Sequence, residues 1–204
     1  SYTDKNILED INLDIYQGDF LLITGPNGGG KTSLLRTILR LQSPTKGQIT
    51  FFRQGEPVSS LDMGYLPQKN SIDSRFPITV EEVVASGLMG NTQKGNTKFD
   101  SKKEIDEMLD LMGITALRNK PIGVLSGGQL QRSLFGRALI SKPEMLILDE
   151  PASYIDRQFG NRMFEILRDL SSNGTTIMMV SHEIEPFITL SNRNLYINHI
   201  LGDR

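Results

Sequence analysis

Apolar runs of strand length recur along the chain and are separated by segments of helical periodicity. The strand-like runs lie at residues 19–24, 48–53, 145–149, 175–180 and 194–198. Several of them are continuously apolar instead of alternating, which is typical of parallel strands buried on both faces. The pattern therefore predicts a parallel sheet that helices cover on both sides.

Helical periodicity marks two segments in the first half of the chain. Within 32–41, the apolar residues fall on one helical face: Leu34, Leu35, Ile38, Leu39 and Leu41. A second helix is predicted from Ser101 to Met112. Ser101 and Glu104 have the spacing of a capping box, and Gly113 stands where a helix C-cap is expected.

Two further helices are predicted in the second half of the chain. One begins at Ser126, and the other follows Asp156 and ends at Asn173. Strands and helices alternate near both ends of the chain, whereas residues 75–140 are mainly helical in pattern. This alternation is typical of an α/β fold with a doubly wound, mainly parallel sheet.

We expect a single domain that spans residues 1–204. Its core is predicted to comprise about 1–70 and about 141–204, with a helical lobe of about 71–140 inserted between them. Within the lobe, the segment 87–100 is rich in Gly, Asn and Thr, and we interpret it as a surface loop.

Composition and charge narrow the class of protein. The chain has 22 basic and 24 acidic residues and a net charge of −2, so the broad basic surface of a nucleic-acid-binding protein is missing. There are no cysteines, which excludes disulfides and thiolate metal sites and fits a cytoplasmic location. No apolar run approaches the roughly 20 residues that a membrane-spanning helix needs. The sequence begins at Ser1 without a methionine, and we expect a further segment to precede it.

A glycine-rich segment, GPNGGGKTS, follows the first apolar run and opens the first predicted helix. This is the context of a phosphate-binding loop, in which backbone amides surround the α- and β-phosphates. Lys31 is placed to reach the β- and γ-phosphate oxygens, and the Thr32 hydroxyl is placed to ligate Mg²⁺. A glycine turn that merely precedes a lysine is the weaker interpretation. The candidate nucleotide-binding residues are Gly25, Pro26, Asn27, Gly28, Gly29, Gly30, Lys31, Thr32 and Ser33.

Polar side chains follow two other apolar runs. Asp149 and Glu150 end the run 145–149, where Asp149 is a candidate Mg²⁺ ligand and Glu150 a candidate to orient the attacking water. His182 follows the run 175–180 and is a candidate to contact the γ-phosphate. The carboxyl ends of parallel strands meet at one edge of a sheet, which is where ligands of such folds bind.

Three weaker signals complete the candidate site. Gln68 lies where the core meets the lobe and is a candidate ligand of Mg²⁺ or of the attacking water. From its position alone, an ordinary surface glutamine is the commoner interpretation. Tyr2 is a candidate to stack on adenine, or an ordinary packing residue. LSGGQ, residues 125–129, opens the predicted helix at Ser126 as a second anion site. His199, in a polar segment near the C-terminus, is assigned no chemistry.

With these motifs in place, the chain resembles the ATP-binding cassette (ABC) family of P-loop NTPases over nearly its whole length. The segment 25–33 resembles the Walker A loop, the segment 145–150 resembles the Walker B strand, and LSGGQ resembles the family signature. Gln68 and His182 match the Q-loop and the switch histidine. The resemblance is specific because most P-loop proteins lack LSGGQ.

The resemblance implies roles for further residues. Asp156 matches the D-loop, although the preceding residues read SYI where SAL is usual, and Tyr2 matches the adenine-stacking aromatic. The expected protein is an ATPase that uses Mg²⁺ and forms a head-to-tail dimer. In that dimer the signature residues, Ser126, Gly127, Gly128 and Gln129, would act on the ATP of the second copy. The dimer would bind a membrane permease at the cytoplasmic face of the cell membrane, with a substrate-binding protein as an indirect partner.

The segment FPITV, residues 76–80, resembles the family branch that imports zinc, manganese or iron, and the iron-chelate importers are the near alternative. Two other functions stay open. One is a non-transport ABC ATPase that acts on nucleic acid or ribosomes. The absence of a heptad array and of a basic stripe argues against it. The other is a regulatory cassette that does not hydrolyse ATP, which the presence of Glu150 and His182 argues against.

Overall fold

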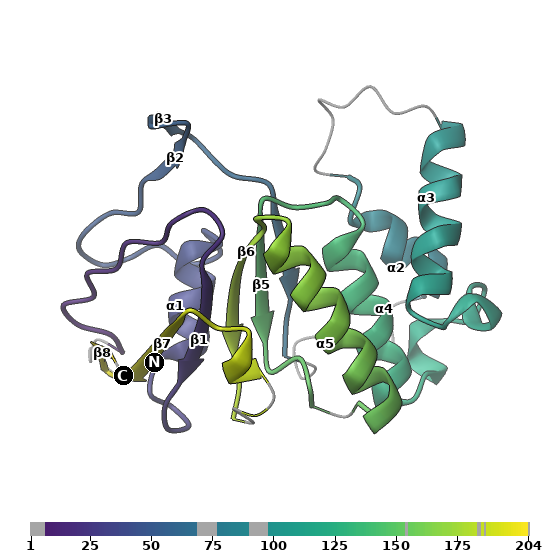
Figure 1. Ribbon diagram of the computed structural model, residues 1–204. Coiled ribbons are helices and arrows are strands. Elements are labelled where there is room, and N and C mark those ends of the chain that lie inside the picture. Colours follow the sequence, from purple (N-terminus) through teal and green to yellow (C-terminus); the bar gives the residue numbers. More distant parts are fainter. Residues whose placement is uncertain are drawn as a thin grey trace.

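A computed structural model describes residues 7–68, 77–89, 98–153, 155–182, 185 and 187–203, with side chains except for those of 98–100 and 200–203 (Figure 1). The predicted role of Tyr2 and most of the predicted loop 87–100 therefore lie outside the described residues. Within the described part of the chain, no helix has the length and apolar character that crossing a bilayer requires.

The main sheet has six strands in the order β4-β5-β6-β1-β7-β8. The strands are β1 (Phe20–Thr24), β4 (Met63–Leu66), β5 (Met145–Asp149), β6 (Thr176–Val180), β7 (Arg193–Asn198) and β8 (Ile200–Asp203). All neighbours pair in parallel except β7 and β8, which form an antiparallel hairpin. Every residue of β5 and β6 is buried, as their continuous apolar runs predict.

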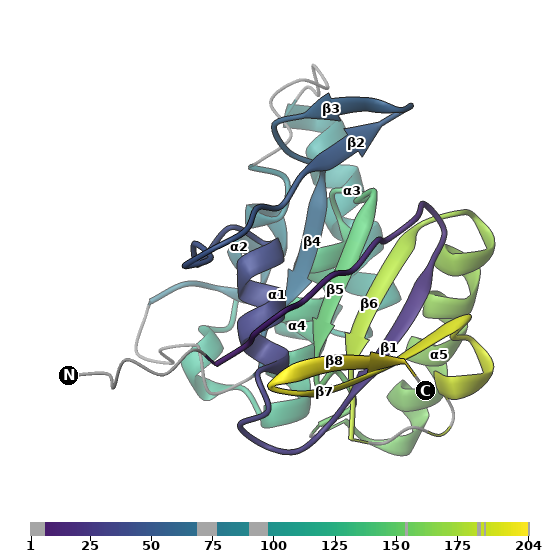
Figure 2. The ribbon, with the colours of Figure 1, turned by 90° about the vertical axis from the view of Figure 1, so that its left-hand side faces the viewer.

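Helices cover both faces of this sheet, which confirms the doubly wound α/β prediction (Figure 2). Helix α1 (Lys31–Ile38) packs on one face, and α4 (Gly127–Leu139) and α5 (Arg157–Ser172) pack on the other. Between β4 and β5 in the sequence, α2 (Val80–Ser86) and α3 (Lys98–Leu111) precede α4. Short 3₁₀ turns at Thr115–Leu117, Ile122–Val124 and Phe187–Thr189 connect the larger elements.

The predicted strand at 48–53 does not belong to the parallel sheet. Only β2 (Phe51–Arg53) forms there, and it pairs with β3 (Glu56–Val58) in a separate antiparallel hairpin. The turn residues Gln54 and Gly55 both have positive φ, 54° and 84°, which is the geometry of a type I′ hairpin turn. A two-residue turn of this kind pairs the strands on either side of it antiparallel, whereas parallel pairing needs a longer crossover connection.

Two predicted helix boundaries are wrong. Helix α1 ends at Ile38, because Arg40 has the left-handed φ of 56°, and Leu41 is therefore 66% exposed instead of lying on the apolar face. Helix α3 begins at Lys98, so Ser101 lies inside it and is not the N-cap. It ends at Leu111, one residue before the predicted Met112, and Gly113 follows with a φ of 66°.

The predicted starts of α4 and α5 are confirmed, and Ser126 and Asp156 are their N-caps. Ser126 Oγ accepts a hydrogen bond from Gln129 N, and the Gln129 side chain accepts one from Ser126 N. The Asp156 carboxylate accepts a hydrogen bond from Phe159 N at 3.0 Å. Helix α5 ends at Ser172 with Asn173 as its C-cap.

Candidate functional site

The glycine-rich loop connects β1 to α1, and two of its glycines make close contacts that leave no room for a side chain. Gly25 has a φ of 143°, and a Cβ there would lie 2.0 Å from Ile197 O of β7. Gly30 has a φ of 100°, and a Cβ there would lie 2.4 Å from Leu8 Cδ2. The loop is thus held tightly against β7 and the segment before β1, with its backbone free of side chains on these sides.

Two substitutions in this loop should differ sharply in stability. Gly25→Ala forces Cβ into Ile197 O and should lower the free energy of unfolding by about 3 kcal/mol or more. Gly28→Ala has the same need for positive φ, 78°, but no atom lies within 4 Å of its Cβ. It should cost only the left-handed backbone penalty of about 1–2 kcal/mol.

Urea-induced unfolding of the two variants measures this difference. Equal destabilisation by Gly25→Ala and Gly28→Ala would show that the approach of Ile197 O does not constrain the loop.

Lys31 places a positive charge at the centre of the loop. Its side chain is buried, and Nζ donates to Gly25 O and to Pro26 O, each at 2.9 Å. Burial lowers the pKa of Lys31, and the nearby carboxylates of Glu150 and Asp149 oppose that shift. A cation beside a glycine-rich loop at a helix start is suited to bind phosphate.

Thr32 and Asp149 form a pair of oxygen ligands beside Lys31. The Thr32 hydroxyl donates to Asp149 Oδ2 at 3.0 Å, and Asp149 is 1% exposed. Burial raises the pKa of Asp149, the hydrogen bond from Thr32 opposes this shift, and Glu150 adds to it. A hydroxyl and a carboxylate at this separation are the hard oxygen ligands that Mg²⁺ prefers.

Three strand ends bring Gln68, Glu150 and His182 together. Gln68 Nε2 donates to one carboxylate oxygen of Glu150 at 3.1 Å, and His182 Nε2 lies 3.2 Å from the other. The side chains follow β4, β5 and β6, which are adjacent in the sheet. Glu150 has a φ of 53°, a left-handed conformation that is uncommon for a residue with a side chain. Gln68 is therefore part of this cluster and not an ordinary surface residue.

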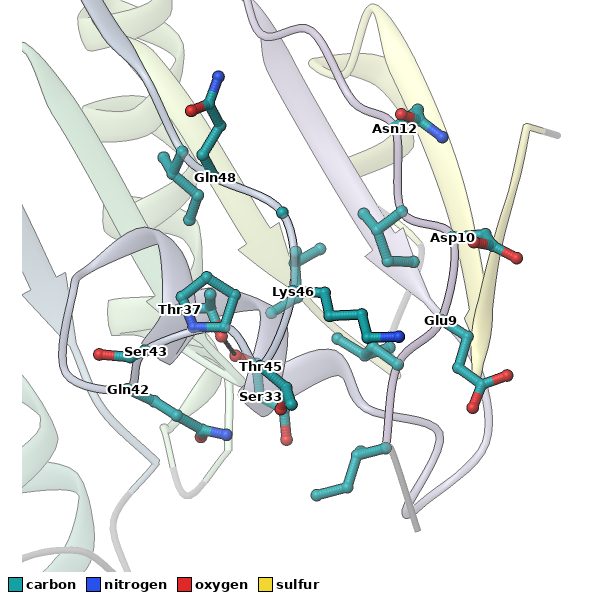
Figure 3. A pocket seen from close by; sticks show the side chains of 17 residues that line it. Glu9, Asp10, Asn12, Ser33, Thr37, Gln42, Ser43, Thr45, Lys46 and Gln48 are labelled. Atoms are coloured by element: carbon teal, nitrogen blue, oxygen red, sulfur yellow. Dashed lines mark hydrogen bonds between the residues drawn. The ribbon is translucent and has the colours of Figure 1, made fainter.

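These groups share one cavity of about 880 Å³. It is lined by the phosphate-loop residues 27–33 and by Ile7, Glu9, Gln68, Glu150, His182 and His199. A second cavity of about 640 Å³ lies on the outer side of α1, between residues 7–12 and 42–49, where Lys46 and Glu9 reach into it (Figure 3). Lys31, Glu150 and His182 line the cavity of about 880 Å³ and not the one of about 640 Å³. We therefore take the larger cavity as the candidate site.

The signature residues lie apart from this cavity. Ser126 is exposed at the start of α4, which packs on the opposite face of the sheet from α1. Its Oγ accepts within the capping box, so the hydroxyl proton is still able to donate to a ligand. Arg132 of α4 forms an ion pair with Asp156 and stacks over Phe159 with its Cζ 4.5 Å from the ring centroid, which joins the signature helix to the start of α5.

Three residues that line this cavity were not predicted from the sequence: Ile7, Glu9 and His199. His199 is the turn residue between β7 and β8, and its N donates to Gly29 O at 3.0 Å. The sequence held one signal for His199: it directly follows a strand-like run, and ligands of such folds bind at the carboxyl ends of the strands.

Comparisons with known proteins give a consistent result. The sequence profile described as "ABC transporter" matches residues 8–153. The "Probable metal transport system ATP-binding protein" of Chlamydia pneumoniae is 40% identical over 200 residues, covering 96% of this chain and 81% of that protein. The zinc uptake system ATP-binding protein ZurA of Listeria monocytogenes is 36% identical over 208 residues, covering 98% of this chain and 78% of that protein. A dimeric ATP-binding cassette solved in a post-hydrolysis state with ADP and Pi superposes with a TM-score of 0.82 at 25% identity, covering 97% of this chain and 90% of that chain.

Proposed function

This chain belongs to the ABC transporter family, and we propose that it is the ATP-hydrolysing subunit of a metal-ion importer. The observation that supports hydrolysis most directly is the Glu150 carboxylate, which Gln68 and His182 hold at the edge of the phosphate-loop cavity. The names of the similar proteins from Chlamydia and Listeria support a metal, and specifically zinc, as the transported ion.

Phosphate binding is assigned to the loop that joins β1 and α1. Lys31 Nζ donates to two loop carbonyls, and we propose that it also reaches the β- and γ-phosphate oxygens of ATP. The amides of 27–33 then surround the remaining phosphate oxygens. Together these groups stabilise the negative charge of the transferred phosphoryl group.

Magnesium binding is assigned to Thr32, Asp149 and Gln68. The chemistry of these groups fits the ion, since Thr32 and Gln68 line the cavity with a hydroxyl and an amide, and the Asp149 carboxylate lies directly behind Thr32. When bound with ATP, Mg²⁺ supplies positive charge to the phosphate oxygens. The chain itself positions the two oxygen ligands by the hydrogen bond from Thr32 to Asp149.

Water activation is assigned to Glu150, with His182 as the contact to the γ-phosphate. A carboxylate oxygen of Glu150 accepts a hydrogen bond from the attacking water and orients the water in line with the phosphoryl group. Because Gln68 and His182 contact opposite oxygens of this carboxylate, they restrain its orientation. The His182 side chain is half-exposed and lines the cavity, which leaves its ring accessible to the γ-phosphate.

The signature residues are proposed to complete the ATP site of a second copy. Ser126, Gly127, Gly128 and Gln129 lie at the exposed start of α4, and the amides of a helix start attract anions. The similar cassette solved as a dimer supports association of two copies. Asp156 is the D-loop residue, forms an ion pair with Arg132, and would lie at the same interface.

We place the dimer at the cytoplasmic face of the membrane, bound to a separate permease that receives its ion from a substrate-binding protein. The import direction is supported by the similar protein from Listeria, which is named as part of a zinc uptake system. We propose that the chain is a single cassette domain, which consists of the core and the inserted helical lobe expected from its sequence.

One substitution should separate stability from activity. Burial raises the pKa of the Asp149 carboxyl, which means that the buried negative charge destabilises the folded state at neutral pH. Asp149→Asn removes this charge and its cost in folding free energy. At neutral pH the apo variant should melt at a higher temperature than the wild type. The difference should shrink as the pH falls toward the ordinary aspartate pKa of 3.8, below which the wild-type carboxyl is neutral in both states.

The same variant should lose ATP hydrolysis by about 100-fold or more, because the asparagine amide lacks the negative charge with which the carboxylate attracts Mg²⁺. Thermal unfolding in the absence of nucleotide and phosphate release with MgATP measure the two effects. A variant that is less stable at neutral pH would contradict the assigned cost of the buried charge.

A transport assay tests the proposed function. Cells that depend on this cassette and its permease should take up zinc with the wild-type chain and not with Glu150→Gln. Affinity capture from detergent-solubilised membranes should recover a multi-span permease. Recovery of ribosomes without a membrane subunit, together with unchanged zinc uptake, would support the nucleic-acid or ribosome alternative instead.

A further inference from the structure

The turn between β7 and β8 is built on one residue, His199, in a left-handed conformation with a φ of 66°. Its main chain makes two bonds: His199 N donates to Gly29 O at 3.0 Å, and its carbonyl accepts from Glu9 N at 2.9 Å. The turn therefore joins the phosphate loop to the segment before β1. Non-glycine residues in this conformation are uncommon and cluster at functional sites.

The sheet order places this turn across the phosphate loop from Glu150 and His182. These two residues follow β5 and β6, whereas His199 follows β7, and β1 with its phosphate loop lies between β6 and β7. All three side chains line the same cavity. An ATP molecule whose γ-phosphate lies at Glu150 and His182 would extend across the loop and bring its nucleoside end to His199.

The imidazole of His199 has a defined tautomer. Its Nδ1 lies 3.0 Å from Ile7 O, and a carbonyl oxygen only accepts hydrogen bonds, so Nδ1 carries the proton. The neutral ring then has Nε2 as an acceptor. The ring is exposed at the cavity wall, beside Ile7 and Glu9. The nucleoside end of ATP offers hydroxyl donors on its ribose that match such an acceptor.

We propose that His199 is a nucleotide-binding residue: Nε2 accepts a hydrogen bond from a ribose hydroxyl of ATP, while the main chain of the same residue holds the phosphate loop. This inference rests on the proposed ATP hydrolysis at the same cavity. It gives the β7–β8 hairpin two distinct functions, of which one depends on the ring and the other only on the backbone.

His199→Gly tests the ring alone. Glycine removes the imidazole, accepts the positive φ and keeps both main-chain hydrogen bonds. The variant should bind ATP about 5–10-fold more weakly, the change expected for loss of one neutral hydrogen bond. Its affinity for tripolyphosphate should be unchanged, and the loss should appear in KM with kcat kept within about twofold.

The ribose contact itself is tested with 2′,3′-dideoxy-ATP. The wild type should bind this analogue about 5–10-fold more weakly than ATP, and His199→Gly should bind the two nucleotides equally. Gln54→Gly is the matched control. It relieves the same left-handed strain, a φ of 54°, in the β2–β3 turn far from the site, and should leave nucleotide binding unaltered (Figure 1).

Three outcomes would overturn the assignment. They are an unchanged ATP affinity in His199→Gly, an equal loss for ATP and the dideoxy analogue, and a parallel loss of tripolyphosphate binding, which would mean that the turn serves only to hold the loop. In each of these cases the wild type still binds and hydrolyses ATP, so the proposed function survives. Failure of the wild type to bind ATP would instead refute the proposed function.

Discussion

Replacing Glu150 by Gln should lower the rate of ATP hydrolysis by about 10²–10⁴-fold, the usual contribution of a positioned acid–base group. ATP binding should persist, because we assign the phosphate contacts to the loop, Lys31 and Thr32 and not to the Glu150 carboxylate. Glutamine has the same shape and keeps an oxygen that can accept from Gln68, so the fold at the strand end should be preserved. The uncleaved ATP should then hold two copies in a closed dimer.

Phosphate release, equilibrium binding of labelled ATP and sedimentation measure these three effects. Glu56→Gln, an exposed substitution on β3, is a control that should change none of them. If Glu150→Gln hydrolyses ATP at the wild-type rate, the assignment of Glu150 to water activation is wrong.

Replacing Ser126 by Arg should abolish ATP-driven association of two copies and leave ATP binding by the isolated subunit nearly unaltered. Ser126 is exposed and lies outside the cavity that contains Lys31, so a bulky side chain there cannot block the chain's own nucleotide. In a head-to-tail dimer the same side chain would occupy the place of the partner's γ-phosphate. Sedimentation with and without ATP, using the hydrolysis-deficient Glu150→Gln background, measures the effect.

A second capping box provides the control for this variant. Ser126→Arg also removes a helix N-cap, which costs about 1 kcal/mol of stability. Thr79→Arg removes the corresponding cap of α2, where Thr79 and Glu82 exchange the same pair of hydrogen bonds. It should show a similar loss of stability and normal ATP-driven association. Loss of ATP binding by monomeric Ser126→Arg would contradict an action on the second copy.

Features that depend on neighbouring residues in the sequence could be predicted. The phosphate loop, the buried strands β5 and β6, and the N-caps Ser126 and Asp156 each have a local signal of spacing or composition. The convergence of Gln68, Glu150 and His182 was also accessible, because the ends of parallel strands meet at one edge of the sheet.

Features that depend on chain reversal could not be predicted in the same way. The end of α1 is set by the left-handed Arg40, for which the sequence has no glycine signal, and so Leu41 was wrongly placed on an apolar face. The left-handed Glu150 and the approach of His199 to Gly29 likewise depend on tertiary packing around the loop. The β2–β3 hairpin is different, since its Gln54-Gly55 turn was available as a signal and was not used.

We infer that each ATP is hydrolysed between the phosphate loop of one copy and the signature of the other. Mixing two inactive variants tests it most directly. Lys31→Ala has an intact signature and Ser126→Arg has an intact phosphate loop, so their heterodimer contains one complete composite site. We predict that the mixture hydrolyses MgATP although neither variant does so alone, with a rate that depends on the concentrations of both. A mixture whose rate equals the sum of the two separate rates would contradict the claim.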